Sequence, residues 1–198
     1  GTHNPLVKPT PCARMRPMPN TIENLRTALI GESTACATYA AYASKALQEG
    51  YPQIAKLFEA TSKAERIHAG NHMRALAKLG GEVPEYEINI KIGTTLENLK
   101  AARAGEVYEF TEMYPPMIAQ AEAEGETQAR TGFAWAMETE KSHARLYAEA
   151  IRQLESGEKL NLPAKYWVCP LCGETFGSLE GVTKCHLCNV PTERFIEF

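Results

Sequence analysis

The chain has 198 residues and a formal net charge of −3, with 44% hydrophobic and 23% charged residues. These values are typical of a globular protein, and no apolar run approaches the ~20 residues that a membrane-spanning helix needs. The basic residues form no stripe that would attract a polyphosphate backbone. We therefore expect neither a membrane nor a nucleic-acid partner, and a chain made of one large unit and one small one.

Residues 1–19 contain five of the twelve prolines and three Lys or Arg residues, but no Asp or Glu. This composition can neither nucleate a helix nor bury a core, so it predicts a flexible tail. The tail also lacks the apolar segment of a secretory signal.

Residues 20–157 show a helical pattern, because apolar residues recur every three or four positions and helix-breaking residues are widely spaced. Asn20 with Glu23, and Thr94 with Glu97, have the spacing of capping boxes. We expect four long helices, with a crossing segment at about 82–93 and a kink at Pro115 and Pro116 in the third helix.

The two halves of this region are an internal repeat. The segment TIENLRTALIGE ending at Glu32 matches TLENLKAARAGE ending at Glu106, at an offset of 74 residues. The second helix of each half aligns at an offset of 75, which places Glu65 on Glu140 and His68 on His143. Two helical hairpins joined by one long crossover predict an all-α, ferritin-like four-helix bundle.

Both halves carry Glu-x-x-His, at Glu65 to His68 and at Glu140 to His143. Positions i and i+3 share a helix face, so each pair can bind one ion. Glu32 lies 18 residues before Gly50 and His68 lies 18 after it. At ~1.5 Å per residue both are about 27 Å from the turn and reach the same height.

In the second half, Glu106 lies 19 residues before Gly125 and His143 lies 18 after it, so these two side chains also reach one height. Burying four glutamates without a cation would be highly unfavourable, so we predict a dinuclear metal site. Mixed carboxylate and imidazole ligands suit iron, with manganese as the competitor.

Three further residues lie near this level. Glu109 follows Glu106 on the same face, where the first half has Ala35, and would add a fifth carboxylate. Tyr39 and Tyr114 fall near the same face, where either core packing or hydrogen bonding to ligands or a bound oxygen species would explain them. These three are the candidate catalytic residues.

After a linker at 158–165, residues 166–198 contain the pattern C-x2-C-x12-C-x2-C, formed by Cys169, Cys172, Cys185 and Cys188. Two such knuckles make a tetrahedral tetrathiolate site, typical of a reducing compartment. From the spacing alone, a structural zinc ribbon is the better prediction.

In order, the motifs are Glu32, Glu65-x-x-His68, Glu106-x-x-Glu109, Glu140-x-x-His143 and the two cysteine knuckles. With them, residues 20–198 resemble rubrerythrin, with a rubredoxin-like domain at the C-terminal end. The resemblance implies a cytoplasmic peroxidase that reduces hydrogen peroxide to water at a non-haem di-iron centre, in defence against oxidative stress. It implies iron rather than zinc at the four cysteines.

The resemblance also implies an electron donor such as a rubredoxin or an NAD(P)H-dependent reductase, and a Glu109 that exchanges places with His68 on one iron. The alternatives are a ferroxidase or iron-storage protein that uses dioxygen, and a zinc interaction module on a metal-binding bundle. One departure from the family pattern is Asn189, where glycine is commoner after the second knuckle.

We further expect a homodimer. The fourth helix continues some 14 residues past His143, so the ribbon should begin roughly 20 Å beyond its own di-iron site. Electron transfer over that gap would be slow. This predicts that the tetrathiolate iron of one subunit serves the other.

Overall fold

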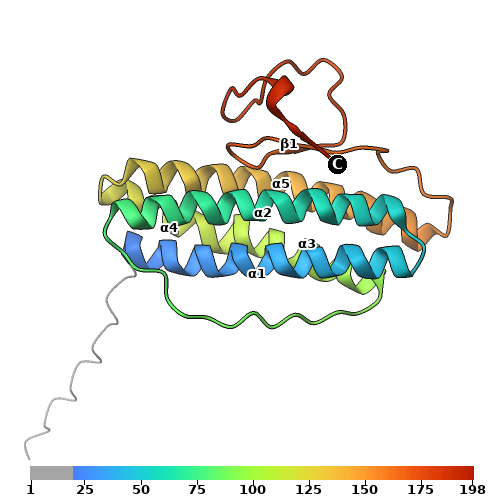
Figure 1. Cartoon of the computed structure of the whole chain (residues 1–198), viewed down its shortest axis with the longest axis horizontal. Coiled ribbons are helices and arrows are strands. Elements are labelled where there is room, and N and C mark those ends of the chain that lie inside the picture. The colour runs from blue at the N-terminus through green and yellow to red at the C-terminus, as the bar shows by residue number, and fades with distance from the viewer. Residues whose placement is uncertain (1–19) are drawn as a thin grey trace, which may run out of the picture.

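The computed structural model describes residues 20–198, so the predicted tail at 1–19 lies outside the described residues. Four long helical segments form a bundle, and a small cysteine-bearing unit lies against one side of it (Figure 1). None of the described helices is long and apolar enough to cross a membrane.

The first hairpin consists of α1 (Thr21–Gln48) and α2 (Pro52–Lys78). The Asn20 side chain caps α1 by accepting a hydrogen bond from the Glu23 amide, and Pro52 occupies the first turn of α2, where no amide donor is needed. Gly50 adopts a φ of +84° in the turn between them, a conformation that glycine adopts without strain.

The crossover, residues 79–94, has neither helix nor strand and runs along the bundle beside α1 (Figure 1). It is anchored near both ends, by the Arg26 side chain on the Glu82 carbonyl and by the Tyr42 hydroxyl on the Lys91 carbonyl. Thr94 and Glu97 then make both hydrogen bonds of a capping box at the start of the second hairpin.

The second hairpin contains α3 (Thr95–Tyr108), the π-helix η1 (Glu109–Met113), α4 (Tyr114–Ala123) and α5 (Thr127–Ser156). In η1 the Tyr114 amide donates to the Glu109 carbonyl, five residues back, so the turn holds one extra residue. That residue accounts for the change in repeat offset from 74 to 75. The helix is thus interrupted by a π turn immediately before Pro115 and Pro116.

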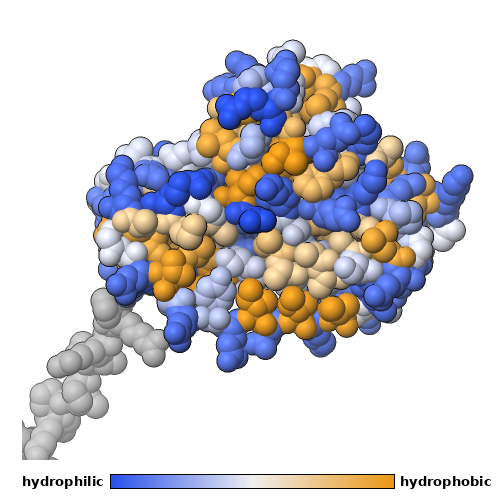
Figure 2. Space-filling model, viewed as in Figure 1, coloured by the Kyte–Doolittle hydropathy of each residue, from blue (hydrophilic) through white to orange (hydrophobic). Residues whose placement is uncertain are grey.

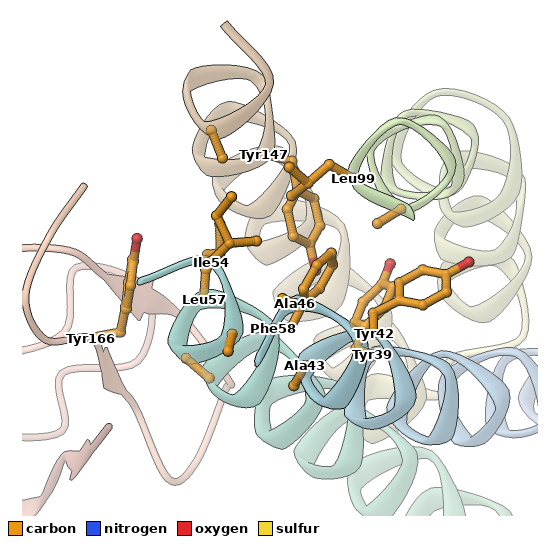
Figure 3. Close-up of a cluster of buried hydrophobic side chains, with 14 of the residues drawn as sticks. Tyr39, Tyr42, Ala43, Ala46, Ile54, Leu57, Phe58, Leu99, Tyr147 and Tyr166 are labelled. Atoms are coloured by element: carbon orange, nitrogen blue, oxygen red, sulfur yellow. The ribbon is translucent and has the colours of Figure 1, made fainter. Parts of the chain in front are cut away.

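Apolar side chains form two clusters in the bundle. One includes Phe58 and Tyr147 near the α1–α2 turn (Figure 3), and the other includes Leu76 and Phe133. Both flank the level at which the repeated glutamates and histidines lie. The ligand level therefore occupies a polar layer between two apolar ones.

The cysteine ribbon, residues 166–198, contains a three-stranded antiparallel sheet in the order β2-β1-β3. Its strands are β1 (Trp167–Val168), β2 (Thr175–Phe176) and β3 (Ile196–Glu197), with a 3-10 turn, η2 (Thr192–Arg194), before β3. Gly173 and Asn189 end the two knuckles with φ values of +82° and +65°. Asn189 thus adopts the left-handed conformation that glycine has in the first knuckle, because asparagine tolerates it well.

The ribbon lies against α2 and α5 of its own chain (Figure 1). The linker turns back along the bundle, where Gln53 accepts from the Leu162 amide and Lys56 donates to the Ala164 carbonyl. Tyr166 and Val168 join the apolar cluster around Phe58. The prediction that the ribbon lies far from its own metal ligands is wrong, because residues 158–165 double back instead of extending α5.

Candidate metal centre

Four helices bring six buried side chains together at one level. Glu32 comes from α1, Glu106 from α3, and each of α2 and α5 contributes a Glu-x-x-His pair. These side chains form two groups, in each of which the ligand atoms lie within 4.8 Å of one another: Glu32, Glu65, His68 and Glu140; and Glu65, Glu106, Glu140 and His143. Glu65 and Glu140 belong to both groups, which is the arrangement that two ions bridged by carboxylates require.

The oxygen atoms of these carboxylates are poorly satisfied. At least one buried oxygen of each of the four glutamates has no hydrogen-bond partner among the described residues. A buried carboxylate oxygen without a donor is unfavourable by several kcal/mol, and a cation removes that penalty. The donor set therefore fits two divalent ions.

Both histidines present Nδ1 to the carboxylates. Nε2 of His68 lies 3.0 Å from the Cys172 carbonyl oxygen, and Nε2 of His143 lies 2.9 Å from the Thr175 hydroxyl. A carbonyl oxygen only accepts, so Nε2 of His68 carries the proton and Nδ1 keeps the lone pair that a metal needs. The ribbon thus orients the two histidines of the candidate metal centre.

The sequence did not indicate these ribbon contacts. Thr175 belongs to no sequence pattern that includes His143, and the sequence indicates Gly173 only as the glycine that follows a cysteine pair. In the structure a Cβ at Gly173 would lie 2.6 Å from Nε2 of His68. Gly173 is therefore needed for the close approach of ribbon and bundle as well as for its positive φ.

The two candidate tyrosines link the hairpins. The Tyr39 hydroxyl donates to Oε1 of Glu106 at 2.7 Å, and the Tyr114 hydroxyl donates to Oε1 of Glu32. Residues 39 and 114 are related by the repeat offset of 75, so each hairpin supplies one tyrosine to the glutamate of the other. Both side chains are buried, and they orient carboxylates.

Glu109 lies outside both groups. Its side chain is half-buried at the start of η1, and its Oε1 atom faces Gly31 of α1. His72, which spacing alone would allow as a ligand, instead has Nε2 2.9 Å from the Tyr114 hydroxyl. Since that hydroxyl donates to Glu32, His72 supports a ligand through Tyr114.

Without metal, the pKa values of the four glutamates diverge. Burial raises the pKa of Glu65 to about 8, helped by the charges of Glu106 and Glu32, and burial also raises that of Glu140. Burial opposes ionisation of Glu32 as well, but the His68 charge and hydrogen bonds outweigh it and lower the pKa. The pKa values of both histidines are raised by the surrounding carboxylates, against the effect of burial.

Iron-free protein should therefore lose stability as the pH rises. The fold holds a proton on Glu65 that the unfolded chain releases above a pKa of 4.5, so this stabilisation is complete below 4.5 and is lost through about 8. Glu140 and both histidines act in the same direction. We expect the free energy of unfolding to fall by about 2 kcal/mol or more between pH 6 and pH 8.

Urea denaturation followed by far-ultraviolet circular dichroism, which reports the helices of the bundle, measures this fall. The iron-loaded protein is the control and should show a smaller fall, because bound metal replaces the protons. Equal stability of the iron-free protein at the two pH values would contradict the prediction.

The ribbon gathers its four cysteines into a second site. The Sγ atoms of Cys169 and Cys188 are 3.3 Å apart, and those of Cys172 and Cys185 are 3.5 Å apart. All four ligand atoms lie within 4.8 Å of one another. Hydrogen bonds among the thiols lower the pKa of Cys169 and raise that of Cys172, so in the absence of metal one thiolate is held by its protonated neighbours.

The family model that matches this chain is "Rubrerythrin", over residues 23–151. The chain belongs to the rubrerythrin family. Nigerythrin of Nitratidesulfovibrio vulgaris is 36% identical over 181 residues, covering 90% of this chain and 87% of that protein. A putative rubrerythrin of Methanocaldococcus jannaschii is 36% identical over 189 residues, covering 90% and 92%.

A solved structure of fully reduced nigerythrin, described as all ferrous, superposes with a TM-score of 0.80 at 34% identity. The superposition covers 95% of this chain and 91% of that one. As a rubrerythrin-family oxidoreductase, the chain has a di-iron site of carboxylates and histidines in a ferritin-like bundle. It has a mononuclear iron at a rubredoxin-like site of four cysteines, so the zinc prediction made from spacing alone is wrong.

Proposed function

We propose that this protein is a peroxidase that reduces hydrogen peroxide to water in defence against oxidative stress. The observation that carries the proposal is the contact between the ribbon and the bundle. Cys172, a ligand of the tetrathiolate site, accepts a hydrogen bond through its carbonyl from His68, a ligand of the di-iron site. Iron storage needs no such electron inlet.

In this proposal Glu65 and Glu140 would each offer oxygen atoms to both ions. Glu32 and His68 would hold one ion, and Glu106 and His143 would hold the other. When bound, the di-iron centre supplies the two electrons that, with two protons, convert one hydrogen peroxide into two waters. The carboxylates balance the charge of the oxidised metals, and Tyr39 and Tyr114 keep the terminal carboxylates in place.

Stopped-flow mixing of the reduced protein with peroxide, and separately with dioxygen, tests this function. A peroxidase should be oxidised faster by peroxide than by dioxygen at equal concentration. Faster oxidation by dioxygen would instead favour the ferroxidase alternative.

Glu109 is proposed as an additional carboxylate ligand that would take the place of His68 when the iron changes oxidation state. Its position just outside the ligand groups, on the turn that breaks the helix, supports this role. Replacing Glu109 by alanine should leave iron content unchanged, because the other ligands still hold the metals. It should lower peroxide turnover by about 10²-fold, because no additional carboxylate is then available to neutralise the higher charge of the oxidised iron.

Glu112 provides the matched control, since it lies in the same π-helix and is exposed. Iron analysis and steady-state peroxidase assays of Glu109→Ala and Glu112→Ala separate the two outcomes. Equal turnover in both variants would assign Glu109 to the solvated surface.

The proposal includes partners. An external donor, such as a rubredoxin or an NAD(P)H-dependent reductase, reduces the tetrathiolate iron, and the cytoplasm keeps the thiols able to bind metal. We also infer a homodimer. Five large apolar side chains of the crossover are exposed: Val83, Tyr86, Ile88, Ile90 and Ile92. Figure 2 shows apolar surface along the edge of the molecule where the crossover runs. The mass in solution tests this inference.

A further inference from the structure

Solvent has unequal access to the carboxylates around the di-iron site. The six side chains of the two ligand groups are at most 1% exposed. Glu109 is half-buried, and its Oε1 atom faces Gly31 of α1. A small molecule that approaches the site from solvent therefore meets Glu109 before any of these six side chains.

The ribbon closes the opposite side of the site. It covers the face between α2 and α5, where the Cys172 carbonyl contacts His68 and the Thr175 hydroxyl contacts His143. Of these two opposite sides, the one between α1 and α3 remains free of the ribbon.

A cavity of about 200 Å³ lies on this remaining side, between α1 and α3, and reaches Glu109. We name it the α1–α3 groove. The residues of the groove used below come from both helices: Gly31, Thr34, Ala35, Thr38, Ala101 and Gly105.

The small side chains keep the groove open. A Cβ at Gly31 would lie 3.9 Å from Oε1 of Glu109, and a Cβ at Gly105 would meet nothing within 4 Å. A water molecule occupies ~30 Å³ in the liquid, and hydrogen peroxide is only somewhat larger, so it fits.

The groove also offers hydrogen-bond acceptors. The hydroxyls of Thr34 and Thr38 donate to backbone carbonyls of their own helix. Each hydroxyl oxygen therefore keeps lone pairs that can accept from the O–H groups of a peroxide. The lining is neutral until Glu109, so it suits a small uncharged molecule that donates hydrogen bonds.

Building on the proposed peroxidase function, we propose that the α1–α3 groove is the route by which hydrogen peroxide and other small hydroperoxides reach the di-iron centre. Gly31, Ala35 and Gly105 set the size limit of the route. Bulky hydroperoxides, such as cumene hydroperoxide, are disfavoured because their aromatic ring is too large for the space that these three small residues leave between α1 and α3.

Ala35→Phe tests the route, with Ala40→Phe as its matched control. Ala40 lies on the same helix but is exposed and borders a different hollow, between α1 and α2. In iron-loaded protein, the rate of azide binding to the oxidised centre, followed by absorbance, reports access without any peroxidase turnover. Ala35→Phe should slow azide binding and lower kcat/KM for hydrogen peroxide by about tenfold.

Ala40→Phe should leave both quantities unchanged. An Ala35→Phe variant that holds full iron and binds azide at the unaltered rate would overturn the proposal. Should Ala35→Phe fail to load iron, Gly31→Ala decides, because its added methyl group sits at an ordinary contact distance from Glu109. It should slow azide binding about threefold, and an unchanged rate would overturn the route.

The unaltered protein should also prefer hydrogen peroxide to cumene hydroperoxide by about 10²-fold in kcat/KM, and equal values would overturn the size limit. A protein without peroxidase activity whose azide binding is still slowed by Ala35→Phe would refute the proposed function but retain the groove as the access route. The two proposals therefore fail separately.

Discussion

Replacement of Glu65 by alanine should abolish loading of the di-iron centre. Glu65 belongs to both ligand groups, so its removal takes an oxygen from each ion and leaves the other buried carboxylates without a shared cation. Iron in the bundle should fall from about two ions per chain to fewer than about one, while the tetrathiolate iron stays. Metal analysis, with the red colour of the ferric tetrathiolate as an internal reference, measures both.

Glu59 is the control, because it lies on the same helix α2 but is exposed. Glu59→Ala should retain full loading. His72→Ala is a stricter comparison, since His72 is as buried as Glu65 but belongs to neither ligand group and hydrogen-bonds to Tyr114, which in turn donates to Glu32. Full di-iron loading in Glu65→Ala together with loss in His72→Ala would refute the ligand assignment.

Removing two ribbon ligands should abolish steady-state turnover but still allow a pre-reduced di-iron centre to complete one turnover. In a variant with Cys169→Ser and Cys172→Ser, electrons from an external donor lose their route to the bundle. A chemically reduced di-iron centre should still react once with peroxide. Turnover with the donor should fall by about 10²-fold or more, whereas Cys36→Ser, which alters a cysteine outside both sites, should have no effect.

The same variant distinguishes electron transfer within a subunit from transfer between subunits. It is mixed with Glu65→Ala/Glu140→Ala protein and the subunits are allowed to exchange. Because each ribbon contacts the ligands of its own bundle, we expect no recovery of activity in the heterodimers. Recovery would show that the ribbon serves the partner, which is the arrangement that chain length alone suggested.

The sequence predicted which side chains come together at one level because distances along a straight helix are fixed. Glu32 and His68 reach one height from their residue counts to Gly50, and the repeat transfers the same reasoning to Glu106 and His143. The extra residue in the second hairpin was visible as a change of offset. Its position at Glu109–Met113 was not, because any turn between residues 106 and 125 could absorb it.

Contacts between elements were not predictable in the same way. Tyr39 was placed near the right face, but its bond to Glu106 depends on how two hairpins pack, and no spacing within either hairpin records that. The contact of Cys172 with His68 depends on the path of the linker, whose residues show no periodic pattern. These contacts are set by tertiary packing, so they required the structure.

The two metal sites differ in how far apart along the chain their ligands lie, and this sets the order in which they can form during folding. The cysteines lie within twenty residues, from Cys169 to Cys188, so metal binding closes only short loops and can begin while the rest of the chain is unfolded. The di-iron ligands extend from Glu32 to His143, and each group needs residues from both hairpins. Contacts of such long range form late. The ribbon can thus take its metal as an independent local unit, whereas the di-iron site forms only when the two hairpins have docked, and its iron stabilises the completed bundle.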